Sequence, residues 1–153
     1  MRIAHKVSVA LIAIALMLFL LLVPRHGRGQ STQDLGDYVV HYSAISTQQL
    51  PADAAAQYGI ARSTNRGLLN VAVEAKRGGD AAMVRANVSA TVSDLTGHTQ
   101  PVQFHETNEN DAFDYLGEFP LNGSGSYLFT LNVTPPGAAH AYVVRFNRDY
   151  VVD

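Results

Sequence analysis

The most concentrated group of side chains with binding chemistry is the run Arg-Ser-Thr-Asn-Arg at residues 62–66. Its two guanidinium groups and three hydrogen-bonding side chains could hold a carboxylate or a phosphate, because charge-assisted hydrogen bonds from Arg are strong and often bidentate. With Tyr58 just upstream, the candidate binding residues are Tyr58, Arg62, Asn65 and Arg66. The same arginines could instead anchor a long loop to acidic neighbours within the fold, and an acidic domain favours that structural role.

A second candidate is the acidic stretch at residues 106–111, with Asp114 close by. Glu106, Glu109 and Asp111 could serve a hydrolase or a carbohydrate-active enzyme, in which two carboxylates flank a sugar bond. A calcium loop of the EF-hand type is absent, because no Gly takes the sharp turn and no Glu closes the loop. The simpler interpretation is an acidic hairpin loop.

The remaining side chains predict neither a metal site nor a catalytic nucleophile. The chain has no Cys, which excludes disulfides, thiolate metal sites and cysteine nucleophiles. No nucleophile elbow, phosphate-binding loop or dinucleotide-binding turn occurs. We therefore expect no enzymatic activity, no metal and no cofactor. The four histidines beyond residue 29 stand on separate segments, so only the fold could gather them around a metal: His41, His98, His105 and His140.

Charge and hydropathy divide the 153 residues near position 29. Residues 7–23 carry no charge and have two basic residues on either side, which is typical of a signal anchor or a signal peptide. At about 1.5 Å per residue this run spans about 25 Å, near the lower limit for crossing a bilayer. We assign residues 1–29 to this segment and residues 30–35 to a tether.

The part of the chain beyond residue 29 is acidic, although the whole chain has a net charge of only −2. Four of the 11 basic residues and none of the 13 acidic ones lie in residues 1–29, which leaves 7 basic against 13 acidic and a net charge of −6. Phosphate backbones and anionic lipid surfaces repel such a domain. We therefore expect no nucleic-acid partner, and membrane contact only through residues 7–23 if they stay uncleaved.

The elements that must position the candidate residues are strands. In the clearest one, residues 83–92, Val and Ala alternate with polar side chains, which is typical of a half-buried strand. A short helix from Pro51 to Gly59 is predicted to connect the first two strands, with Pro in its first turn and Gly at its end. Alternation predicts seven strands in all: residues 37–45, 68–75, 83–92, 100–107, 112–119, 126–134 and 141–147.

Short strands separated by Gly-rich and Pro-rich turns indicate an all-β fold. We expect an antiparallel, immunoglobulin-like β-sandwich of about seven strands with one short helix, preceded by the N-terminal hydrophobic signal or anchor segment. The chain has no Cys and no Trp, so it is not an antibody-type domain, and "immunoglobulin-like" describes architecture alone.

Seven short motifs, taken in order, carry a family resemblance. They are Gly36–Tyr42 (GDYVVHY), Tyr58–Ile60 (YGI), Arg62-Ser63, Arg66–Val71 (RGLLNV), Asp94–Gly97 (DLTG), Phe104–Thr107 (FHET) and Asp111-Ala112. The ordered set resembles domain-of-unknown-function family 4426 of bacterial exported proteins, over most of residues 36–153. The resemblance implies a periplasmic location and no established activity, so it transfers no catalytic residue. The leader lacks the clean cleavage site expected of a periplasmic member, which leaves anchoring to the inner membrane open.

These observations predict a non-catalytic binding or protein-interaction module in the periplasm, soluble or anchored to the inner membrane. We expect a protein partner in the cell envelope, contacted through the helix and the loop at residues 62–66. The alternative is an envelope hydrolase or carbohydrate-active enzyme that uses the carboxylates of residues 106–114.

Overall fold

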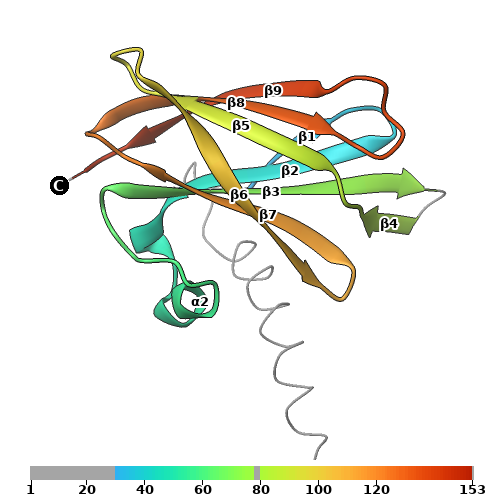
Figure 1. Ribbon diagram of the computed structural model, residues 1–153, viewed down its shortest axis with the longest axis horizontal. Helices are drawn as coiled ribbons and strands as arrows, with labels where there is room; N and C mark the ends of the chain where they lie inside the picture. Colours follow the sequence, from blue (N-terminus) through green and yellow to red (C-terminus); the bar gives the residue numbers. More distant parts are fainter. Residues whose placement is uncertain (1–29, 78–79, 153) are drawn as a thin grey trace, which may run out of the picture. The chain divides into compact units, whose positions relative to one another are not determined.

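The computed structural model describes residues 30–77 and 80–152 (Figure 1). The predicted signal or anchor segment lies outside these residues. In the part of the chain that the structure describes, no helix has the length and apolar character needed to cross a bilayer.

The described residues form nine strands and few helical turns. Every pairing between these strands is antiparallel. The strands are β1 (Ser31–Asp34), β2 (Tyr38–Ser46), β3 (Arg66–Arg77), β4 (Asp80–Met83), β5 (Asn87–Ser93), β6 (Thr99–Glu109), β7 (Ala112–Pro120), β8 (Gly125–Thr134) and β9 (Tyr142–Tyr150).

The strands follow one path, β1-β2-β3-β7-β6-β5-β8-β9, with β4 added beside β3. Strand β6 joins the two halves of this path, because its residues 99–102 pair with β5 and its residues 103–109 pair with β7. The sheet curls until Tyr42 on β2 packs against Phe146 on β9, with ring centroids 4.6 Å apart. The result is a nearly closed, barrel-like antiparallel sheet.

The predicted immunoglobulin-like sandwich is therefore confirmed only as an all-β antiparallel fold. A strand shared by both halves replaces two separate sheets. The alternation of apolar and polar residues could not reveal this, because a period of two assigns a side chain to a face and does not identify the neighbouring strand.

All seven predicted strands are present, but two of the sequence predictions were wrong in detail. Residues 31–34 form the edge strand β1 on β2 and are not part of a tether. Their side chains are polar and mostly exposed, so no apolar alternation marked them. The predicted strand at residues 83–92 is interrupted at residues 84–86, where the chain passes from β4, paired with β3, to β5, paired with β8.

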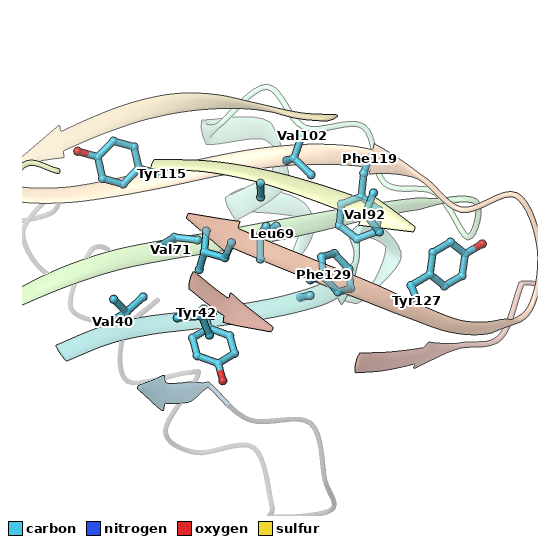
Figure 2. Close-up of a cluster of buried hydrophobic side chains, with 14 of the residues drawn as sticks. Val40, Tyr42, Leu69, Val71, Val92, Val102, Tyr115, Phe119, Tyr127 and Phe129 are labelled. Atoms are coloured by element: carbon cyan, nitrogen blue, oxygen red, sulfur yellow. The ribbon is translucent and has the colours of Figure 1, made fainter. Parts of the chain in front are cut away.

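The core lies inside the curled sheet, as Figure 2 shows. The alternating positions Val40 and Tyr42 on β2 and Leu69 and Val71 on β3 are buried in it, as the period of two predicts. Aromatic rings join the two halves. Phe129 on β8 stacks on Phe146 at 4.8 Å and meets the ring of Phe119 on β7 edge-on at 5.1 Å.

The short helix is confirmed as α2 (Ala52–Gln57), with Pro51 as its N-cap and Gly59 at a φ of 66° just beyond its end. A 3-10 turn, η1 (Thr47–Gln49), precedes it. Figure 1 shows α2 outside the curled sheet, beside the half that contains β3 and β7. A hydrogen bond joins the two ends of the connection between β2 and β3. Thr47 is fully buried, and its Oγ1 accepts from the Ser63 backbone N–H at 2.9 Å.

Candidate functional site

The arginines of the predicted binding loop each have a partner within the fold. Arg62 Nη2 donates to the backbone oxygen of Gln48 at 2.9 Å. Arg66 Nη1 lies 3.0 Å from Glu118 Oε2 on β7. Both arginines are exposed, so neither contact closes them to solvent. These contacts match the structural role considered for the two arginines, in which they anchor a long loop to the rest of the domain.

The other two predicted binding residues face different surroundings. The Asn65 side chain hydrogen-bonds Ser63 Oγ, and its backbone oxygen accepts from the Leu121 N–H at 2.9 Å. Tyr58 caps the C-terminal end of α2. Burial raises the pKa of its hydroxyl, and the charges of Glu109 and Asp114 raise it further. Tyr58 is therefore under the electrostatic influence of the acidic stretch.

The acidic stretch forms the hairpin between β6 and β7. Asn110 and Asp111 both have positive φ, 52° and 63°, as a tight two-residue hairpin turn requires. Asp111 is exposed in this turn. Glu106 and Glu109 stand three positions apart on β6, so they point to opposite faces of the sheet. The carboxylates of Glu106, Glu109 and Asp111 therefore do not share one face as a catalytic pair would. The interpretation of this stretch as an acidic hairpin loop is confirmed.

A polar row crosses the outer face of the sheet beside the hairpin. The register aligns His41 on β2 with Ala72 on β3, and Ala72 with Asp114 on β7. His41 Nε2 lies 2.8 Å from Glu74 Oε2. Burial raises the pKa of Asp114, as does the charge of Glu109, while a hydrogen bond from Asn70 and the charge of His41 oppose the shift. Spacing along the sequence could not reveal this row, because its side chains come from four strands: His41 on β2, Asn70 and Glu74 on β3, Glu109 on β6 and Asp114 on β7.

An open groove of about 740 Å³ lies where residues 84–86 pass between the two halves of the sheet. Val88, Phe104 and Tyr115 contribute apolar surface, and Tyr115 is buried beneath. Tyr115 Oη accepts a hydrogen bond from the Ala86 N–H at 2.9 Å, which holds the irregular segment against the sheet.

Opposite charges stand at the rim of the groove. Arg85 Nη2 lies 2.6 Å from Glu106 Oε1, and the Arg85 guanidinium lies 5.0 Å from the centroid of the Phe113 ring. The Arg85 side chain keeps 64% of its exposure, so donors remain open to a ligand. The sequence analysis named Glu106 as a candidate residue. It did not name Arg85, because an arginine at a polar position of a predicted strand gives no sign of binding.

An open groove with an apolar floor and an exposed guanidinium suits an extended polypeptide, since small-molecule sites usually enclose most of their ligand. Within residues 30–77 and 80–152, no three His, Asp or Glu side chains are placed to hold a metal ion.

Comparison with known proteins identifies similar sequences and folds. A family model described as "Domain of unknown function (DUF4426)" matches residues 32–153. The crystal structure of a DUF4426 family protein from Pseudomonas aeruginosa PAO1 is similar to this chain at 30% identity and a TM-score of 0.67, covering 82% of this chain and 97% of its own. None of the curated proteins compared matches this chain.

Two structures of FetP from uropathogenic Escherichia coli strain F11 share the fold, each at a TM-score of 0.57. One is the protein as isolated after recombinant expression in the periplasm of E. coli BL21(DE3), at 17% identity, covering 79% of this chain and 93% of its own. The other is a copper-bound variant at 16% identity, covering 80% and 95%. At these identities the likeness extends to the fold alone.

Proposed function

Since this chain belongs to the DUF4426 family, whose function is unknown, we propose its role from the geometry: it is an exported, non-catalytic binding module. Its groove takes an extended segment of a partner protein in the cell envelope. The observation that carries this proposal is the combination of an apolar groove floor with the exposed guanidinium of Arg85.

The chemistry of the groove defines the segment that it binds. An apolar side chain of the partner would cover Val88 and Phe104, which removes apolar surface from water. A carboxylate of the partner would take the free donors of Arg85, as a charge-assisted hydrogen bond. The loop at residues 62–66 is the competing contact surface, because Arg62 and Arg66 are also exposed.

A periplasmic location is part of the proposal. The uncharged run at residues 7–23 supports export, and FetP, which shares the fold, was expressed in the periplasm. Mass analysis of the protein from membrane and soluble fractions distinguishes an uncleaved anchor from a released domain. The copper of the FetP variant is not extended to this chain, because the two share only the fold at 16% identity.

The test is a pull-down from envelope extract with the full chain. Three baits are compared: the natural chain, Arg85→Glu, and Arg62→Ala/Arg66→Ala. We expect Arg85→Glu to lose the partner and the loop variant to keep it, with all three equally folded by circular dichroism. Loss in the loop variant alone assigns the contact to that loop, and identical partner sets for all three refute the groove.

A second candidate function, a carboxylate-dependent hydrolase, has one observation in its favour. The pKa of Asp114 is raised by burial and by Glu109, as in a general acid. Incubation with peptidoglycan fragments tests it. Turnover that is lost in Asp114→Asn supports this function, and absence of turnover by the natural chain removes it.

A further inference from the structure

Strand β9 is the last strand of the sheet path and pairs only with β8 in the described part of the chain. It runs for nine residues, YVVRFNRDY, without a Pro or Gly to interrupt it. Its other edge therefore presents a row of backbone donors and acceptors suited to another strand. Proteins usually shorten or block such edges, so an uninterrupted one is a candidate interaction surface.

The outer face of β9 carries an ordered set of exposed side chains. Val143, Arg145, Asn147 and Asp149 alternate along it, and Val151 follows. Val143 is 51% exposed and Val151 is 74% exposed. The set has opposite charges on either side of Asn147 and valines beyond them.

Arg145 and Asp149 cannot pair with each other within one strand. They stand four residues apart, which is about 13 Å in an extended chain. Neither belongs to an ion pair among the residues that the structure describes. Across β8 they lie opposite Thr130 and Ser126, which carry no charge.

We propose that β9 pairs antiparallel with β9 of a second copy of this chain, about a two-fold axis at Asn147. In this register Arg145 lies opposite the partner's Asp149, and the symmetry repeats the pair. Val143 lies opposite the partner's Val151, and the two Asn147 side chains meet at the axis. Opposite charges and apolar side chains in direct cross-strand positions stabilise antiparallel pairs.

Neighbouring two-fold registers lack this complementarity. An axis at Arg145 places two arginines opposite each other, and an axis at Asp149 does the same with two aspartates. Like charges in that position are destabilising. An axis at Phe146 or Arg148 leaves both outer-face charges opposite uncharged residues. The register at Asn147 is thus selected by the sequence of β9 itself, and its symmetry closes the assembly as a dimer.

Cysteine crosslinking in the full chain tests the proposal, because the natural chain has no Cys. Opposite residues in an antiparallel pair have Cα atoms about 4.5–5.5 Å apart, which lies within the disulfide range of about 4.4–6.8 Å. Asn147→Cys is expected to give a covalent dimer on mild oxidation, read on a non-reducing gel. The control is Ser89→Cys, which is also exposed but lies on the interior strand β5.

Charge reversal then tests the register. In the Asn147→Cys background, Arg145→Asp makes both symmetric pairs repulsive and is expected to lower the dimer yield at least about fivefold. Adding Asp149→Arg exchanges the charges and restores the yield. A yield from Asn147→Cys no higher than from Ser89→Cys overturns the dimer. A yield that the charge exchange fails to restore overturns the register.

Discussion

The hydrogen bond between Tyr115 and Ala86 allows the groove wall to be weakened without changing its shape. Tyr115→Phe removes only the hydroxyl that accepts from the Ala86 N–H at 2.9 Å. The ring stays in place, since Tyr115 is 5% exposed and packed in the core. We expect residues 84–86 to open more readily and the affinity for the partner segment to fall.

The size of the effect follows from the donor that is left behind. Ala86 is partly buried, so its N–H loses its partner without full access to water. An unsatisfied donor of this kind costs about 1–3 kcal/mol. Because the segment is irregular, we expect about 1–2 kcal/mol of this to appear as easier local opening, which is about a 5- to 30-fold change in the opening equilibrium.

Residue-resolved amide hydrogen exchange measures this opening at Ala86. The matched control is Tyr127→Phe, which removes a hydroxyl that donates to the Gly123 backbone oxygen at 2.8 Å. Figure 2 shows Tyr115 and Tyr127 at opposite ends of the core cluster. The control should lower global stability and leave the exchange of Ala86 close to that of the natural chain. Unchanged exchange at Ala86 in Tyr115→Phe, or equal acceleration in both variants, would refute the reasoning.

Two further predictions concern stability. Gly67→Ala places a Cβ in steric clash with Cζ of Phe119, so we expect the free energy of unfolding to fall by about 1–3 kcal/mol in denaturant titrations. Phe119→Leu in the same chain should recover part of this loss. The pKa of Asp114 is raised in the folded chain, so ionisation of this carboxyl opposes folding at any pH above its pKa of 3.8 in the unfolded chain. Asp114→Asn should therefore stabilise the chain at pH 7 and lose this advantage below pH 3.8. Asp94 provides the matched contrast, because a hydrogen bond from Thr96 lowers its pKa and Asp94→Asn should therefore destabilise the chain at pH 7. An equal dependence of stability on pH in the two variants would contradict both pKa directions.

Several features of this protein were determined by local sequence. Alternation at Val40 and Tyr42 predicts which side chains enter the core, because successive residues of a strand point to opposite faces. Pro51 and Gly59 bound the helix, because Pro suits a helix start and Gly tolerates the positive φ at its end. The acidic hairpin was predictable for a similar reason, since Asn110 and Asp111 adopt the positive φ of a tight turn.

Other features depend on which distant strands become neighbours, and only the tertiary structure decided them. The sharing of β6 between two halves places Glu106 in the groove, where it meets Arg85 from 21 residues away. The fold also brings Tyr58 within the electrostatic reach of Glu109 and Asp114, which follow it by 51 and 56 residues. A period of two identifies the face of each strand but not its partner, and pairing is set by packing summed over the whole sheet. The free edge of β9 has the same origin, because the sequence of β9 supplies its complementary charges while the sheet path leaves that edge open.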